Sequence, residues 1–269
     1  MNESITRALS GIVYVSLLIT ATLISPISFI ILFGIFMLIA IAEFCRLVSL
    51  NWRFPIFLGV LCYAVFILLM QKTASANLFL SGSACFIAVM LLAELFSKKT
   101  IKKDTAAKFA QLAGYIIIPF ILIMRLPFSL SVNYTPYIII GIFILIWVND
   151  TFAYIVGKSM GRHKLFQRIS PKKTIEGFLG GMVFTIGAGY IISMYYNILS
   201  AAGWMASAAI IVIFGTLGDL TESKLKRTAG VKDSGNIMPG HGGILDRLDS
   251  VIFAIPFLFL YYQIIHYVS

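Results

Sequence analysis

Chemically active side chains gather in one stretch of this chain, residues 219–249, which lies between the apolar runs 208–217 and 251–260. The stretch holds five of the eleven Asp and Glu residues, five of the twenty-one Lys and Arg residues, and five glycines. A charged segment between two runs that are apolar enough to enter a bilayer predicts a polar site held at the membrane surface.

The acids of this stretch have helical spacing. On a helix, Asp219, Glu222 and Lys226 would share one face, and Asp246 and Asp249 are also about one turn apart. Two helix ends can therefore present carboxylates to one point. Carboxylate oxygens are the ligands that Mg²⁺ prefers beside substrate phosphates and water. The acids therefore predict a Mg²⁺ site near Asp219, Asp246 and Asp249.

Basic side chains accompany these acids and could neutralise phosphate charge: Lys224, Lys226, Arg227, Lys232 and Arg247. The segment 240–243, with His241 between glycines, precedes an apolar run, so its backbone N–H groups could approach an anion at a helix N-terminus. A solvated positive loop would explain the Lys and Arg residues equally well. It would explain neither the acids on apolar flanks nor the glycines around one histidine, and we therefore favour a metal–polyphosphate site.

Long apolar segments must position these residues. Hydrophobic residues make up 59% of the 269 residues, charged residues 12%, and the mean hydropathy is +0.95. Such a composition predicts an all-α, polytopic integral membrane protein. We expect a single membrane domain over 1–269. Its N-terminal helical part is 1–135, and the helices of 136–269 would carry the catalytic residues. At about 20 residues per span, nine segments qualify: 8–25, 27–45, 54–70, 77–96, 109–125, 136–156, 175–198, 202–222 and 248–267. The first two form a tight hairpin or one helix broken at Pro26.

The basic residues predict an orientation for these spans. With nine spans, nineteen of the twenty-one Lys and Arg residues fall on the side of the N-terminus, and only Lys72 and Arg125 fall on the other. Cytoplasmic loops carry the excess of Lys and Arg. We therefore expect a multi-pass protein of the cell membrane with a cytoplasmic N-terminus, an extracytoplasmic C-terminus and the 219–249 stretch facing the cytoplasm. The net charge of +10 fits this topology and not a nucleic-acid partner. The first apolar run has no small-residue cleavage motif, so we expect a retained helix.

Carboxylates within apolar segments usually face a cavity, form a pair or bind an ion, because burying them in a bilayer is costly. Glu43 and Glu94 lie near predicted helix ends, each followed by a basic residue, so a solvated ion pair and a functional role are both open. Asp150, which follows Asn149, lies deep in the predicted span 136–156 and is the stronger candidate for a functional role.

The seventh predicted span has a distinctive start. Ser170 and Pro171 favour a helix start, with Ser as the N-cap and Pro as the first helical residue, and Glu176 opens the apolar part. Gly177 and Gly181 would form a small-residue face that lets another helix approach. We interpret these glycines as packing residues.

The pattern from 223 to 249 resembles the C-terminal signature of the phosphatidate cytidylyltransferases, also called CDP-diacylglycerol synthases. The matching residues are Ser223, Leu225, Lys226, Arg227, Lys232, Asp233, Gly235, Pro239, His241, Gly242, Gly243, Ile244, Asp246, Arg247, Leu248 and Asp249. Met238 stands where that signature usually has Leu or Ile, a swap that conserves volume. The Asn149–Asp150 pair and the segment 170–177 are also similar to that family, so the resemblance covers about residues 140–250.

The resemblance implies an enzyme of phospholipid biosynthesis that transfers a cytidylyl group from CTP to phosphatidic acid at a bilayer, giving CDP-diacylglycerol and pyrophosphate, with Mg²⁺ as cofactor. It implies catalytic roles for Asp219, Lys226, Arg227, His241, Asp246 and Asp249. Of these, Asp219 and Asp246 would bind one Mg²⁺ ion or two, and Asp249 would be a further ligand or would orient the ligands. Phosphate contacts are expected from Lys172, Lys173, Ser223, Lys232, Arg247, Gly242 and Gly243, and further roles are open for Asn149, Asp150 and Glu176. A histidine hydrogen-bonded within its loop is the alternative for His241. The oligomeric state is left open, a homodimer included.

Other membrane functions fit the sequence less well. A CDP-alcohol phosphatidyltransferase would need an Asp-Gly dipeptide, which does not occur here. A lipid phosphate phosphatase would need a second histidine with a nearby acid, and the only later histidine is His266. An ion-coupled transporter would use Asp150, Glu176 and Asp219 near helix centres, whereas most acids here lie toward helix ends.

Overall fold

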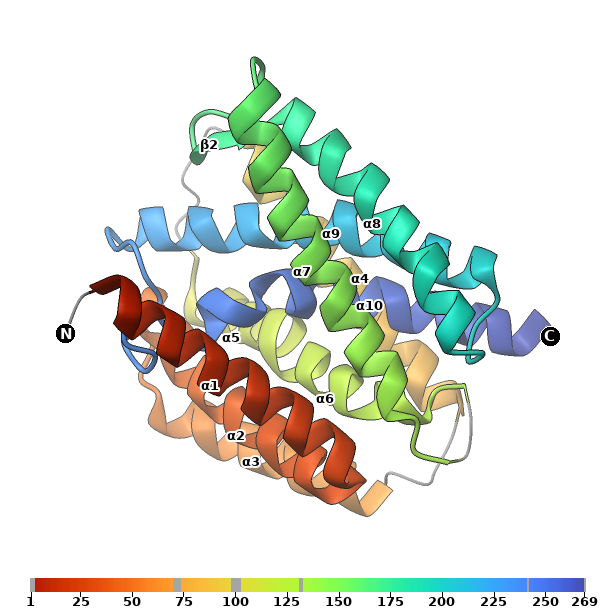
Figure 1. Ribbon diagram of the computed structural model, residues 1–269. Helices are drawn as coiled ribbons and strands as arrows, with labels where there is room; N and C mark the ends of the chain where they lie inside the picture. The colour runs from red at the N-terminus through yellow and green to blue at the C-terminus, as the bar shows by residue number, and fades with distance from the viewer. Residues whose placement is uncertain (1–2, 70–73, 98–102, 131–132, 241, 269) are drawn as a thin grey trace.

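The computed structural model describes residues 3–69, 74–97, 103–130, 133–240 and 242–268, and most of them are helical (Figure 1). The helices are α1 (Glu3–Ile24), α2 (Pro26–Leu47), α3 (Arg53–Leu69), α4 (Ala74–Phe96), α5 (Thr105–Leu112), α6 (Ile118–Arg125), α7 (Pro136–Met160), α8 (Ile175–Tyr195), α9 (Ala201–Thr228) and α10 (Leu245–Val268). A π-helical turn, Ala113–Ile117, joins α5 to α6, and a 3₁₀ turn, Leu126–Phe128, follows α6.

The helices fit a membrane. Within the described residues, seven helical segments are long and apolar enough to cross a bilayer, and α3 and α4 contribute two shorter apolar stretches. Large apolar side chains such as Leu179, Val183 and Ile191 are exposed on α8, which is unfavourable in water but suits contact with lipid. The all-α polytopic prediction is therefore confirmed. The count of nine spans and their orientation stay predictions.

The first two helices form a hairpin. Of the two arrangements predicted at Pro26, a tight hairpin and one broken helix, the structure has the hairpin. Ser25 is the N-cap of α2, and its hydroxyl accepts a hydrogen bond from Ser28 N (3.0 Å) while Ser28 Oγ accepts one from Ser25 N (3.1 Å). Ser28 Oγ also donates to the carbonyl of Ala21 (2.7 Å) on α1. These local bonds satisfy polar groups at the turn and let α2 fold back against α1.

Glycines bring α7 and α8 together. A Cβ at Gly177 would lie 2.6 Å from the carbonyl oxygen of Ala153, and one at Gly181 would lie 2.6 Å from Asn149 Oδ1. Real Cβ atoms essentially never come this close to another atom. A larger side chain at Gly177 would therefore force the helices apart, and one at Gly181 would have to displace the Asn149 side chain. The interpretation of these glycines as packing residues is confirmed.

The start of α8 differs from the prediction. Residues Ser170–Thr174 form a strand, β2, which pairs antiparallel with β1 (Lys164–Phe166). The helix begins at Ile175, and its N-cap is Thr174, whose Oγ1 accepts from Gly177 N (3.1 Å). The prediction of Ser170 as N-cap was wrong. Extended backbone suits the residue before Pro171, and the hairpin carries the lysines of β2 to one end of the helix bundle.

Two helices extend beyond the predicted spans. α9 continues six residues past 222, and α10 begins three residues before 248. Lys226 and Asp246 are therefore helical residues and not loop residues. Helical backbone fixes their direction more tightly than a loop would, which favours a site built between α9 and α10.

The predicted topology can be tested with reporters. A reporter fused after Ser269 should be extracytoplasmic, and one inserted next to Lys103 should be cytoplasmic, because nineteen of the twenty-one basic residues then face the cytoplasm. Alkaline phosphatase and green fluorescent protein fusions would measure this, and a fusion before Met1 should lie on the same side as the one at Lys103. Finding both fusions on one side would contradict the nine-span prediction. Part of the charge count (Lys72, Lys98, Lys99 and Lys102) lies outside the described residues.

Candidate active site

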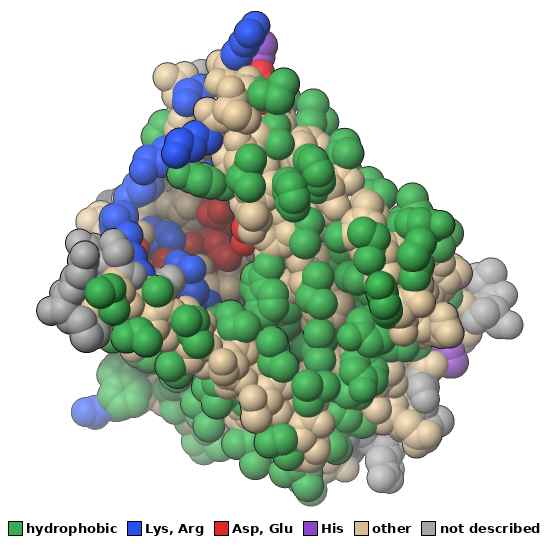
Figure 2. Space-filling view, viewed as in Figure 1, with side chains coloured by type: hydrophobic (Ala, Val, Ile, Leu, Met, Phe, Trp, Pro, Cys, Tyr) green, Lys and Arg blue, Asp and Glu red, His purple; other side chains and the backbone are tan. Residues whose placement is uncertain are grey.

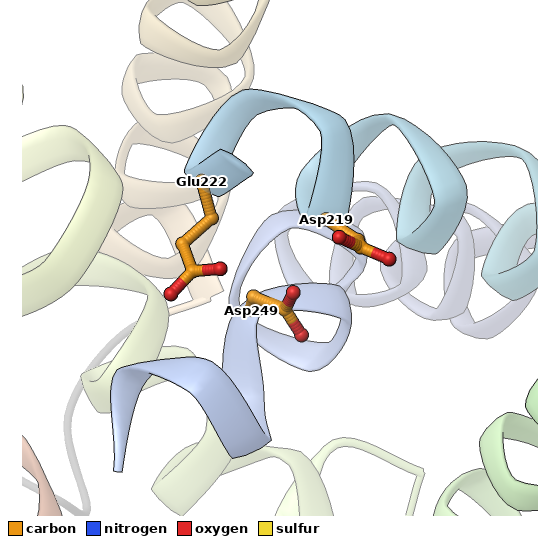
Figure 3. A group of neighbouring side chains, drawn as sticks. All are labelled: Asp219, Glu222 and Asp249. Atoms are coloured by element: carbon orange, nitrogen blue, oxygen red, sulfur yellow. The ribbon is translucent and has the colours of Figure 1, made fainter. Parts of the chain in front are cut away.

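Three carboxylates meet where α9 and α10 cross. Asp219 and Glu222 belong to α9 and Asp249 to α10, and one oxygen of each lies within 4.8 Å of the others. In Figure 3 the side chains from α9 extend toward Asp249. The predicted helical face is confirmed, because residues three apart on α9 point to the same side. We call these three residues the acidic cluster.

Glycine on α9 makes the close crossing feasible. A Cβ at Gly218 would lie 2.7 Å from the carbonyl oxygen of Asp249, and one at Gly215 would be in contact with Ser250 Cβ at 3.4 Å. Any larger residue at 218 would separate the two backbones. Gly218 therefore sets the distance between the carboxylates of α9 and α10.

Lys226 lies between acids of both helices. Its Nζ is 2.5 Å from Glu222 Oε2 and 2.6 Å from Asp246 Oδ1. The exposed fractions of the side chains are only 13% for Lys226, 1% for Glu222 and 4% for Asp246. Water screens such charges poorly, so the lysine is the principal partner that compensates two buried carboxylates.

Asp219 is the acidic-cluster member with a cation from the β1–β2 hairpin beside it, and its side chain is 34% exposed. It forms an ion pair with Lys173 of β2 and accepts a hydrogen bond from Ser223 Oγ at 3.2 Å. The unexpected hairpin thus delivers a cation to the cluster. Both partners were predicted as phosphate contacts, and the structure places both beside Asp219.

Asp246 has a different environment from the acidic cluster. Its Oδ2 accepts three hydrogen bonds, from Ser234 N (2.8 Å), Ser234 Oγ (2.7 Å) and Gly243 N (2.8 Å), while Oδ1 faces Lys226. These bonds tie the 229–244 loop to the start of α10. Asp246 therefore organises the loop and is not one of the three acids that converge, so its role as a metal ligand stays a prediction. Glu222, which shares the predicted helix face, joins Asp219 and Asp249.

Glu43 supports the same loop from α2. Its side chain is buried, at 2% exposure, and accepts hydrogen bonds from Ile244 N (3.1 Å), Leu245 N (2.8 Å) and Ser234 Oγ (3.3 Å). The carboxylate thus satisfies backbone donors at the N-terminus of α10, where a negative charge is favourable. A solvated ion pair at the end of α2 is thereby excluded. An isolated acid in an apolar run was the only sequence signal of this role.

Cavities open on two sides of the acidic cluster. The α7–α8 cavity, of about 640 Å³, is lined by Asp219, Asp150 and four lysines: Lys158, Lys164, Lys172 and Lys173. The α1–α7 cavity, of about 220 Å³, is lined by Asp249, Asp246, Asp150 and Arg247 together with apolar and aromatic residues: Tyr14, Val15, Phe143, Ile146, Trp147 and Met238. Figure 2 shows a hollow with Asp and Glu side chains inside and Lys and Arg along its edge, on a face that is otherwise largely hydrophobic.

The sequence as a whole matches a known family. The model of the cytidylyltransferase family matches residues 5–265. The chain belongs to this family. Phosphatidate cytidylyltransferases of Staphylococcus epidermidis and Staphylococcus saprophyticus are 52% and 48% identical to it over 118 residues, and that of Staphylococcus aureus is 49% identical over 120. Each match covers 43% of this chain and 45% of the relative, so the chain matches less than half the length of these curated relatives.

Not all of the basic residues predicted beside the acids contact them in the described part of the chain. Arg227 and Lys232 are exposed, and Arg227 Nη1 donates to the carbonyl of Val231 (3.4 Å). Lys224 lies on the opposite face of α9, where its Nζ donates to the carbonyls of Glu94 and Ser97. Its predicted place around the acids was wrong, since it lies about 140° round the helix from Asp219 at 100° per residue.

The glycine loop around residues 240–243 is folded on itself. Gly240 and Gly242 have φ values of +76° and +85°, which favour glycine. Gly243 N donates to Asp246, and the carbonyl of Gly242 accepts from Met238 N at 2.9 Å. The amide of Gly243 is thus occupied within the protein. His241 lies outside the described residues, and its predicted role stays a prediction.

The acids and amide upstream take separate places. Asp150 is exposed and lines both cavities. Asn149 is buried, and its Oδ1 has no hydrogen-bond partner among the described residues. Glu176 accepts from Arg162 N (3.1 Å) and His163 N (3.1 Å) and pairs with the His163 ring. Glu176 therefore fastens the end of α7 to α8 and does not approach the acidic cluster.

The acidic cluster has the donor set of a divalent-cation site. Three carboxylates converge, and Glu222 Oε1 is buried without a hydrogen-bond partner among the described residues. An unpartnered buried carboxylate oxygen is costly, and carboxylate oxygens suit Mg²⁺. The cluster therefore fits a metal of this kind, with Asp219, Glu222 and Asp249 as its candidate ligands.

Two matched substitutions on α10 should change stability in opposite directions. Asp249→Asn removes one of three mutually repelling carboxylates, so without divalent cations the melting temperature should rise by a few degrees. Asp246→Asn breaks hydrogen bonds and the ion pair to Lys226, at a cost of about 1–3 kcal/mol, so the melting temperature should fall. Thermal unfolding in detergent with a chelator would measure both. Equal shifts in the same direction would contradict the division between cluster and loop carboxylates.

Glu43→Gln should destabilise the protein although it changes only one atom. The amide nitrogen cannot accept the backbone N–H groups at the start of α10, so the loss should be about 1–3 kcal/mol. Glu94→Gln is the matched control, because Glu94 is about a quarter exposed in its pair with Lys103 and should cost under about 1 kcal/mol. Thermal unfolding of both variants would decide. A Glu43 variant as stable as the Glu94 variant would show that the buried carboxylate does not hold the loop.

Proposed function

We propose that this chain transfers the cytidylyl group of CTP to phosphatidic acid, giving CDP-diacylglycerol and pyrophosphate. Family membership and relatives named phosphatidate cytidylyltransferase support this reaction. The observation that carries the proposal is the acidic cluster between a lysine-lined cavity and an apolar one. That arrangement suits a reaction between a water-soluble polyanion and an anionic lipid.

Charge and polarity assign one substrate to each cavity. The triphosphate of CTP fits the α7–α8 cavity, where Lys172 and Lys173 can neutralise it. The phosphate of phosphatidic acid fits the α1–α7 cavity, where Arg247 provides charge and the aromatic wall accepts the glycerol and upper acyl chains. The Tyr14 hydroxyl in this wall has no hydrogen-bond partner among the described residues and is free to donate to the lipid phosphate.

The reaction needs positioning more than proton transfer. A phosphate oxygen of phosphatidic acid attacks the α-phosphorus of CTP, and the bond from that phosphorus to the β-phosphate oxygen breaks, so pyrophosphate leaves with the electron pair. The attacking phosphate is already an anion, and no strong general base is required. Lys173 can move from Asp219 to the leaving phosphates, and Lys226 holds Glu222 and Asp246 in place.

A divalent cation completes the proposal. Mg²⁺ bound by Asp219, Glu222 and Asp249 would neutralise charge on the α-phosphate and pyrophosphate as the bond breaks. The proposed location is the cell membrane, with this site facing the cytoplasm, where the excess of Lys and Arg favours that side.

Synthesis from labelled CTP and phosphatidic acid tests the function and the metal together. The purified protein should form CDP-diacylglycerol with Mg²⁺, lose this activity in a chelator and recover it when Mg²⁺ is restored. Asp219→Asn and Asp249→Asn should lower turnover by orders of magnitude, and neither should show the rise in melting temperature that Mg²⁺ gives the unsubstituted protein.

His241→Ala separates metal chemistry from base catalysis. Substrate use should weaken only moderately, because the lipid phosphate brings its own charge. Full activity in a chelator, combined with an inactive His241 variant, would overturn the mechanism. Absence of any lipid nucleotide under all conditions would contradict the proposed function and favour the alternative, an ion-coupled transporter.

A further inference from the structure

A third cavity lies on the far side of α9 from the acidic cluster. This α4–α9 cavity, of about 540 Å³, is lined by the ends of α2 and α4, the region around α5 and the last turns of α9. The α9 residues in its wall include Thr221, Lys224 and Thr228. They lie on the helix face opposite Asp219 and Lys226, since each residue advances the helix by about 100°. The cavity is therefore separate from the proposed catalytic site.

The polar part of this cavity is positively charged. Three lysines line it, Lys103, Lys108 and Lys224, against a single acid, Glu94. Lys103 Nζ lies 2.6 Å from Glu94 Oε2 and 2.7 Å from Gln111 Oε1. Glu94 is thus occupied by one lysine, and positive charge is left in excess.

Two groups in the wall have unused hydrogen-bonding capacity. Gln111 is only 4% exposed, and its Nε2 has no hydrogen-bond partner among the described residues. Its orientation is set by Lys103, because an ammonium group only donates and must face the amide oxygen. Lys108 has no ion pair or hydrogen bond through its ammonium group within the described part of the chain. A donor amide and a cation therefore both lack an acceptor here.

The rest of the wall is apolar and lies at helix ends. Leu47, Leu91, Leu95 and Leu225 face the same space. Helix ends of a membrane bundle lie at the level of lipid headgroups, where lysines attract anionic lipids. A free phosphate would use the lysines and leave the leucines exposed, whereas a lipid matches both parts of the wall.

We propose that the α4–α9 cavity binds an anionic phospholipid, with its phosphate held by Lys103, Lys108 and Gln111 and its apolar part against the leucines. The lipid is separate from any lipid in the α1–α7 cavity, because α9 stands between the two. The proposal is independent of the function proposed above, since no residue of the acidic cluster takes part.

Native mass spectrometry of the full-length protein tests the site. Phosphatidylglycerol and phosphatidylcholine with identical acyl chains serve as probes, and the protein should retain phosphatidylglycerol several-fold better. Lys108→Gln should lower this retention about fivefold, and Lys103→Gln should do the same or more. Arg53→Gln is the matched control, because it removes an exposed positive charge at the start of α3, next to the end of α2, without lining the cavity, and it should change retention less than twofold.

Each result decides for or against the lipid site. Lys108 has no internal partner to lose, so its variant should fold normally and its loss of lipid would support the proposal. Equal retention of both lipids would overturn it, as would equal effects of the Lys108 and Arg53 variants. Loss of phosphatidylglycerol in Arg247→Gln instead would assign the lipid to the α1–α7 cavity, which Arg247 lines. Full displacement by millimolar inorganic phosphate would show that the cavity recognises free phosphate and not a lipid.

Discussion

Mutual repulsion among the carboxylates at the α9–α10 crossing is the constraint on which the rest of this structure depends. One oxygen of each acid lies within 4.8 Å of the others, and two unit charges at that distance repel by about 3.5 kcal/mol at an effective dielectric constant near 20. A protein stabilised by only about 5–15 kcal/mol can hold three such acids together in their charged form only with cations nearby. Lys226 and Lys173 supply part of this charge, and the unpartnered Glu222 Oε1 marks where more is needed.

Two other acids of the region, Asp246 and Glu43, have structural roles that keep the acidic cluster in place. Asp246 and Glu43 both accept from Ser234, and between them they bind the backbone from Gly243 to Leu245. A polar loop that folds back against an apolar bundle must satisfy its buried N–H groups internally. The two carboxylates do this, and in doing so they fix where α10 begins. The direction of Asp249 follows from that start, so the cluster depends on acids that take no part in it.

The sequence predicts the parts of this site that depend on one helix and misses the parts that depend on contacts between distant segments. The common face of Asp219, Glu222 and Lys226 follows from helical spacing alone, and the all-α membrane architecture follows from hydropathy. The role of Glu43 requires knowing that α2 lies beside the start of α10, about two hundred residues away in the chain. The charge of Lys224 suggests a phosphate contact, but its angle on α9 places it on the face away from Asp219.

The β1–β2 hairpin shows why local signals can also mislead. Ser170 and Pro171 carry a helix-start pattern, yet Pro171 also favours extended backbone before it, and pairing with β1 satisfies that backbone. Because of the strand, α8 begins only after its N-cap Thr174. Lys173 therefore lies outside α8, where it can reach Asp219. Had α8 begun at Ser170, Lys173 would lie in its first turn, where the helix dipole disfavours a cation. The extended segment therefore lets Lys173 bring a positive charge to Asp219. A helix in the same position would disfavour that charge.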